Sequence, residues 1–167
     1  GGFISYDAGN LAATYVGAGR YSITGPGGAN VGSFSTNIDL GTPLVWTNTD
    51  AAKTVNRSSG LTVTWTGGES GSVVNIAGSS FTTSGTSISG STFICLANRS
   101  AGSFTIPANI LTQLPASPAI SAGGFSIVTR GVLSVGLSGN GVRVTASGLD
   151  YFLVSDNTTT SVTTQYQ

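Results

Sequence analysis

Histidine and methionine are absent from the sequence, and there is one cysteine, Cys95. Because there is no histidine, the chain cannot build a Ser–His–Asp triad, a Cys–His dyad or the common histidine metal sites. A single cysteine has no partner within the chain, so a disulfide scaffold is excluded. No apolar run approaches the roughly 18 residues that a membrane-spanning helix needs. These absences argue against most catalytic chemistries and against insertion into a membrane.

Charge is also scarce in this sequence. Charged residues make up 7% of the chain, six basic and six acidic, so the formal net charge is zero. Nucleic acids and anionic membranes are bound through basic patches, and the arginines here are scattered along the sequence. With so few charges, the surface has to be formed by Ser, Thr, Asn and Gly. This composition is common in extracellular and cell-envelope β-proteins, and it predicts a secreted or cell-surface location.

The clearest pattern is a strand bounded by glycines, in which Leu61, Val63 and Trp65 alternate with three threonines. A period of two places the large apolar side chains on one face and the hydroxyl groups on the other. A tryptophan on such a central strand is a natural nucleus for a sandwich core. The residues that we expect in the core are Leu61, Val63, Trp65, Phe93, Cys95, Phe104 and Ile106.

Most of the remaining sequence consists of short apolar or alternating segments separated by turn signals. Residues 20–24 and 31–40 alternate on either side of a Gly-Pro-Gly-Gly stretch, which predicts a hairpin. Residues 91–97 are apolar at successive positions, which predicts a strand buried on both faces. Residues 78–90 are rich in Ser, Thr and Gly, and we expect a long loop or a ragged edge strand there.

One helical signal is present. Pro107 suits a first helical position, and Ile110, Leu111 and Leu114 share a face, so a short helical crossover is expected near 107–114. About a dozen short strands with regular turn signals predict an all-β fold, an immunoglobulin-like or jelly-roll β-sandwich of antiparallel strands. We expect residues 1–20 to be an N-terminal segment or lead-in strand, and residues 21–167 to form a single sandwich domain.

Several segments together resemble a group of uncharacterised secreted proteins of soil bacteria. The matching segments are Tyr21–Ala29, Pro43–Asn48, Val55–Gly68, Phe93–Cys95, Ala101–Pro107, Ile110–Pro115 and Ala146–Asp150. They cover most of the chain after Arg20, and they are moderately specific as a set. The resemblance implies an immunoglobulin-like β-sandwich in an exported protein. It implies no activity and transfers no functional residues.

The carboxylates offer little for catalysis. A glycoside hydrolase needs two carboxylates that face one cleft, and only Asp7, Asp39, Asp50, Glu69, Asp150 and Asp156 are available. Asp150 and Asp156, together with Asn157, could share a calcium ion, because calcium takes oxygen ligands from loops. The simpler interpretation is that they are turn formers, whose side chains bond to their own backbone. We predict no catalytic residues and no cofactor.

Aromatic residues are the candidates for ligand binding, because flat rings pack against the C–H side of sugars. Trp46 and Tyr151 could form such a site, since the alternation around Trp65 assigns that residue to the core. Lys53, the only lysine, raises the alternative of an isopeptide cross-link, but its neighbours give no support and an exposed lysine is the default. Cys95 lies in the most apolar stretch, where burial raises the pKa of a thiol and makes it inert.

The sequence therefore predicts a non-catalytic structural or adhesive module of an exported bacterial protein. The alternative is a carbohydrate-binding module that uses exposed aromatic residues. The expected partner is a polysaccharide or another surface protein. A cluster of exposed aromatics would favour the carbohydrate-binding module, whereas buried aromatics under a smooth Ser/Thr/Gly surface would favour the structural or adhesive one.

Overall fold

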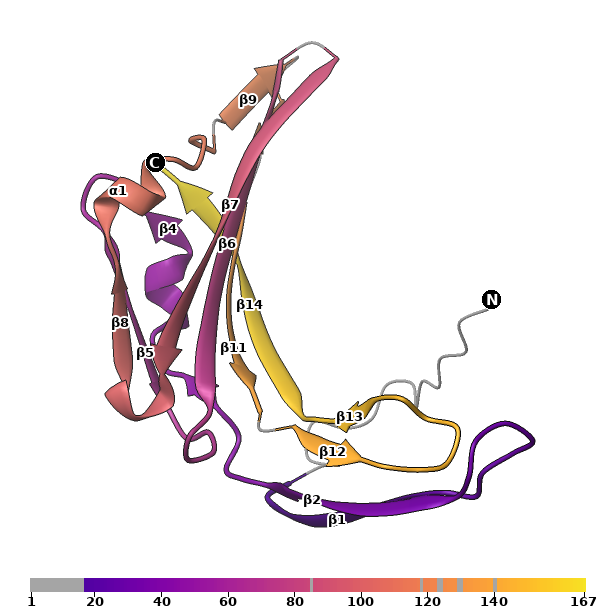
Figure 1. The fold of residues 1–167 in the computed structure, drawn as a ribbon. Helices are drawn as coiled ribbons and strands as arrows, with labels where there is room; N and C mark the ends of the chain where they lie inside the picture. Colours follow the sequence, from indigo (N-terminus) through magenta and orange to yellow (C-terminus); the bar gives the residue numbers. More distant parts are fainter. Residues whose placement is uncertain (1–16, 85, 118, 123–124, 129–130, 140) are drawn as a thin grey trace.

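The structure is a computed structural model that describes residues 17–167 apart from 85, 118, 123–124, 129–130 and 140. Residues 1–16, which make up most of the predicted lead-in segment, lie outside the described residues. The described chain is an all-β, sandwich-like fold with one short α-helix (Figure 1), so the predicted fold class is confirmed.

Two sheets form the body of the sandwich. The larger has the strand order β4 (Thr54–Val55), β14 (Asn157–Tyr166), β11 (Gly131–Ser138), β6 (Val73–Ser84) and β7 (Ser87–Asn98). The smaller has the order β3 (Val45–Trp46), β5 (Leu61–Thr66) and β8 (Ser103–Ile106). Neighbouring strands are antiparallel except for β4, which runs parallel to β14. The alternation that predicted the central strand corresponds to β5, in the middle of the smaller sheet.

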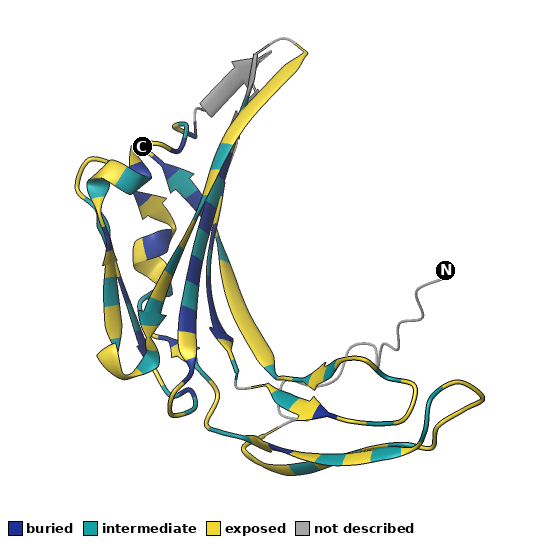
Figure 2. Ribbon diagram, in the orientation of Figure 1, coloured by how far each residue is buried: buried dark blue, intermediate teal, exposed yellow. Residues whose placement is uncertain are grey.

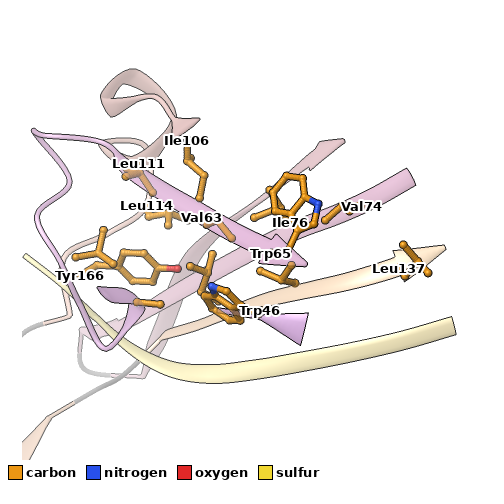
Figure 3. Packing of buried hydrophobic residues seen from close by; sticks show 14 residues of the cluster. Trp46, Val63, Trp65, Val74, Ile76, Ile106, Leu111, Leu114, Leu137 and Tyr166 are labelled. Atoms are coloured by element: carbon orange, nitrogen blue, oxygen red, sulfur yellow. The ribbon is translucent and has the colours of Figure 1, made fainter. Parts of the chain in front are cut away.

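The hydrophobic core lies between these two sheets. Val63 and Trp65 on β5 meet Val74 and Ile76 on β6, and all four are 3% exposed or less. Figure 3 shows their side chains together with those of Trp46 and the other labelled core residues. Ile106 is also buried, while the other predicted core residues are partly buried and pack against the same cluster; they are Leu61, Phe93, Cys95 and Phe104.

The helical crossover closes one end of this core. Helix α1 (Ala108–Leu111) follows Pro107, which has extended backbone angles and caps the helix instead of occupying its first turn as predicted. Leu111 and Leu114 are 0% and 2% exposed, so the crossover covers the core with two apolar side chains. Two short 3-10 helices, η1 (Thr49–Ala52) and η2 (Arg99–Ala101), connect strands elsewhere.

Three hairpins flank the body, namely β1 (Gly19–Gly25) with β2 (Phe34–Leu40), β9 (Ala119–Ala122) with β10 (Phe125–Val128), and β12 (Val142–Val144) with β13 (Phe152–Val154). The β1–β2 pair is the predicted hairpin, with Gly19 opposite Leu40. It contacts the β12–β13 hairpin, where the rings of Phe34 and Phe152 meet edge to face at 5.3 Å. Figure 1 shows these two hairpins at one end of the molecule.

Phenylalanine rings lie over glycines of the neighbouring strand in three directly opposed pairs. The pairs are Phe34 over Gly25, Phe81 over Gly90, and Phe93 over Gly78. A Cβ at any of these glycines would come within 2.1 to 2.3 Å of a ring carbon. Because the ring occupies the space that a side chain at the opposite position would need, only glycine can lie opposite it. A shift in register would bring a residue with a side chain under the ring, so each pair fixes the register of its hairpin.

The expectation of a long loop over residues 78–90 is wrong, and the alternative of an edge strand holds only for residues 87–90, which begin the edge strand β7. Strands β6 and β7 continue through this region in unbroken register from Val73↔Asn98 to Ser84↔Ser87. Small residues such as Ser, Thr and Gly show no apolar alternation, so periodicity could not reveal the strands. Backbone pairing and the Phe81–Gly90 contact hold them together instead.

The prediction that residues 91–97 are buried on both faces is also wrong. Strand β7 is the edge of the larger sheet, and only its core-facing side chains, such as Phe93 and Cys95, are partly buried. On the opposite face Ile94 and Leu96 are 68% and 65% exposed. The apolar run had predicted two covering layers, and the described chain supplies only one.

Replacing Gly78 by alanine tests the contacts between rings and glycines. The new Cβ would lie 2.3 Å from the Phe93 ring and 2.9 Å from the Tyr166 hydroxyl. Both neighbours are packed in or against the core, so we expect a loss of about 1–3 kcal/mol from the free energy of unfolding, measured in urea. The control is Gly90→Ala, since Phe81 is 52% exposed and its ring can move away. Equal losses in the two variants would contradict this account.

Alkaline pH tests the burial of Tyr166. Burial raises the pKa of this phenol to about 12, whereas in the unfolded chain it is about 10. The stabilising contribution is complete below pH 10. Above that, the unfolded chain loses the proton first, so the free energy of unfolding should fall by about 2–3 kcal/mol by pH 12. Tyr166→Phe should flatten this fall and Tyr151→Phe should not, as measured by denaturant unfolding. Parallel curves for the wild type and Tyr166→Phe would count against the prediction.

Candidate functional site

The face of the larger sheet that points away from the smaller sheet carries several exposed apolar side chains, and we call it the outer face. Alternation and pairing register place four sets of side chains on it. These are Thr92, Ile94 and Leu96 of β7; Val73, Asn75, Ala77 and Ser79 of β6; Val132, Ser134, Gly136 and Ser138 of β11; and Asn157, Thr159, Ser161 and Thr163 of β14. None of them carries a charge.

The outer face changes in character from one edge to the other. At the β7 edge, Ile94 and Leu96 are 68% and 65% exposed, Ile88 nearer the hairpin turn is 74% exposed, and Val132 on β11 is 43% exposed. Toward β14 most of the side chains carry hydroxyl groups, as in the directly opposed pair Ser134 and Ser161. Figure 2 shows how much of β14 and of the β6–β7 hairpin is exposed. The result is an apolar edge beside a smooth hydroxyl-rich surface.

Two open hollows lie side by side on this face and share Ala77 and Ser134. The first, about 210 Å³, is lined by residues that include Asn75 and Thr159. The second, about 310 Å³, lies nearer the β7 edge and is lined by residues that include Ile94. The Asn75 Oδ1 atom is buried and accepts no hydrogen bond within the described residues. Hollows of this size are at the lower limit of small-molecule pockets, and they suit a partner that lies across the sheet.

Trp46 does not lie on any such surface, so its prediction as an exposed ligand-binding aromatic is wrong. It is 6% exposed in the core, directly opposite Trp65 on the neighbouring strand. Its indole N–H donates to Asn48 Oδ1 at 2.9 Å, and the same oxygen accepts the Thr64 backbone N–H. The short segment around Trp46 showed no alternation, because β3 has only two residues.

Tyr151, the other predicted ligand-binding residue, is 66% exposed. The guanidinium of Arg143 lies 5.9 Å from the centroid of its ring, a cation–π contact that covers one ring face. Among the described residues, Phe81 is the other highly exposed aromatic. It lies near the hairpin end of β6 and β7, at the opposite end of the molecule from β13 (Figure 1). The structure therefore brings no second described ring to Tyr151.

The two predicted metal ligands are not brought together. Asp150 and Asp156 flank the two ends of β13, so a strand of about 10 Å separates them. Asp156 instead lines a pocket of about 290 Å³ with Glu69, whose carboxylate accepts the Gly41 N–H at 2.5 Å. Within the described part of the chain, no three His, Cys, Asp or Glu side chains gather as a metal site. Sequence reasoning had not placed Glu69 near Asp156, because they are far apart along the chain.

Lys53 and Cys95 both have simple environments. The Lys53 ammonium lies 2.6 Å from Asp50 in an exposed ion pair, which lowers the pKa of that carboxyl. This is the default expected for the only lysine, and the contact does not resemble a buried cross-link. Burial raises the pKa of the Cys95 thiol, so less of the reactive thiolate is present.

Comparison with known proteins identifies no relative: no family model, no curated protein and no solved structure matches the chain. In the part of the chain that the structure describes, no helix combines the length and hydropathy needed to cross a membrane.

The outer face was missed in the sequence because apolar residues at successive positions predict burial on both sides. The apolar run from Phe93 to Leu96 is the signal that could have identified this face, because its second apolar side has to be covered by something.

The contrast between Trp46 and Tyr151 gives a direct test of where each ring lies. Trp46→Ala leaves a large cavity and should lower the free energy of unfolding by about 3–5 kcal/mol. Tyr151→Ala removes an exposed ring and should change it by no more than about 0.5 kcal/mol. Urea unfolding followed by circular dichroism measures both variants without relying on tryptophan emission. Full stability of Trp46→Ala would contradict its place in the core.

Proposed function

We propose that the chain is a non-catalytic structural or adhesive module of an exported bacterial protein, and that it works by protein contact through the outer face. The observation that carries this proposal is the uncovered β7 edge, where Ile94 and Leu96 are exposed next to an uncharged sheet surface. Exposed apolar groups that lie together on a polar background are typical of surfaces where proteins meet.

The composition supports a place outside the cell. The surface is formed by hydroxyl and amide side chains in place of charges, as in many exported β-proteins. The resemblance of segments such as Val55–Gly68 to secreted proteins of soil bacteria points the same way. Nucleic acids and anionic membranes are attracted by a positive electrostatic potential, and the outer face has no charged side chain to create one. A neutral protein surface is therefore the partner that it fits best.

The carbohydrate-binding alternative has weaker support. Sugar platforms use open aromatic faces, but Trp46 and Trp65 are buried and one face of Tyr151 is covered by Arg143. The exposed ring of Tyr151 lies just before β13 and that of Phe81 lies on β6, and these two places are at opposite ends of the molecule (Figure 1). A smooth Ser/Thr surface over buried aromatics is the pattern expected for the structural or adhesive module.

Attachment of coated beads tests the proposal. The chain is coupled through a cysteine introduced by Lys53→Cys in a Cys95→Ser background, because Lys53 precedes β4, at the edge of the sheet opposite β7. The beads are then presented under flow to glass coated with the chain itself, with collagen, with cellulose or with chitin. We expect attachment to at least one protein-coated surface, and a large loss of attachment in the double variant Ile94→Ser/Leu96→Ser.

Tyr151→Ala is the matched control, because it removes an equally exposed large side chain that does not belong to the outer face. It should leave the attachment unchanged. Beads that attach to no protein-coated surface would overturn the proposal. Attachment to cellulose or chitin alone, abolished by Tyr151→Ala, would do the same and would support the carbohydrate-binding module.

A further inference from the structure

Strand β7 differs from every other edge of the two body sheets. The edges at β3 and β4 are two residues long, and β8 has four residues and is followed by Pro107. Strand β7 has twelve residues, without a proline or a charged side chain. Within the described residues, no strand pairs with its outer side. Proteins normally protect a sheet edge by shortening it or by adding lysine, proline or a bulge, and β7 shows none of these protections.

The free edge is accompanied by exposed apolar surface. Ile94 and Leu96 lie on the outer face of this edge strand, and their exposures of 68% and 65% are among the highest of any apolar residue described. A strand added beside β7 would pair its backbone groups and cover these two side chains at the same time. The backbone ladder and the side-chain contact therefore point to the same occupant, an extended neutral strand.

We propose that this occupant is the β7 strand of a second copy of the chain, paired antiparallel across a two-fold axis. This inference rests on the proposed function and names its partner. A two-fold interface has to be complementary to itself. The β7 strand meets this condition because it carries no charge that a second copy would repel, and the chain as a whole has a net charge of zero. With the two-fold axis through Cys95, residues 92–98 of the two β7 strands pair with each other, and at about 3.4 Å per residue this shared edge is about 24 Å long.

The alternation of side chains fixes which residues meet. Directly opposed residues of an antiparallel pair lie on the same face, so outer-face residues must oppose outer-face residues. When the axis passes through Cys95, Ile94 lies opposite the partner subunit's Leu96, and Leu96 lies opposite the partner subunit's Ile94. This register brings the Ile94 and Leu96 side chains of the two copies into contact, while Ile88 lies beyond the paired residues. It also joins the two larger sheets into one continuous sheet with a doubled outer face.

Analytical ultracentrifugation of the full chain tests the proposal. We expect a dimer at micromolar concentrations, and we expect Ile94→Lys or Leu96→Glu to weaken the association by about tenfold or more, because each places like charges near the axis. Both side chains are exposed, so both variants should fold, as circular dichroism can verify. The control is Val45→Lys on β3, which is 53% exposed and should leave the dimer intact.

Mixing the two charged variants tests the register. In a mixed dimer, the lysine of Ile94→Lys faces the glutamate of Leu96→Glu, and the remaining Leu96 and Ile94 keep their contact. We therefore expect the mixture to regain the dimer that each variant alone has lost. A chain that is monomeric at all concentrations, an association that neither charged variant weakens, or a mixture that does not recover would each overturn the proposal.

The bead assay separates this proposal from the proposed function. A monomeric chain whose beads attach to collagen would rule out a second copy as the partner and leave the adhesive module standing. A dimeric chain whose beads attach to none of the protein-coated surfaces would rule out the adhesive module and leave the pairing of two copies standing.

Discussion

The sandwich depends on two buried tryptophans whose N–H groups must find acceptors. Trp46 and Trp65 are directly opposed on β3 and β5, and together they supply the largest apolar surface of the smaller sheet. Trp65 donates to the Arg99 carbonyl at 2.9 Å, and Trp46 donates to the Asn48 side chain. Because an unpaired buried N–H is costly, these bonds determine where the segments at Asn48 and Arg99 cross the ends of the sheets.

With so little charge, the rest of the fold is held by apolar packing and neutral hydrogen bonds. Among the described residues the two ion pairs are both exposed, where such pairs contribute little. Hydroxyl pairs take their place on the smaller sheet, as between Thr62 and Thr105 at 2.9 Å. Glycine is also used for packing: Gly78 has no side chain, and the Phe93 ring occupies that space. A composition rich in Gly and Thr is thus compatible with well-defined registers.

The sequence was informative wherever large apolar residues alternated with polar ones. That pattern revealed β5 and the β1–β2 hairpin, and the helical spacing of apolar residues after Pro107 revealed the crossover. It failed where small residues formed strands, as in the β6–β7 hairpin, because a Ser/Thr/Gly ladder is held by its backbone and has no apolar period. It also misplaced Trp46, since two strand residues are too few to show on which face the ring lies. Both the strands of small residues and the buried position of Trp46 depend on pairing with other strands. The periodicity of a short stretch of sequence does not show that pairing.

The candidate site was harder to predict for a related reason. An apolar run such as Phe93–Leu96 states that both faces of a strand prefer to leave water, but it does not state which molecule covers each face. The described chain covers one face with Trp65 and its neighbours and leaves Ile94 and Leu96 exposed on the other. An apolar side chain that stays fully exposed loses about 1.5–3 kcal/mol of the stabilising free energy that its burial would supply. Strand β7 therefore has the composition of an inner strand at the position of an edge, which is the expected result when the second layer or the next strand belongs to another molecule.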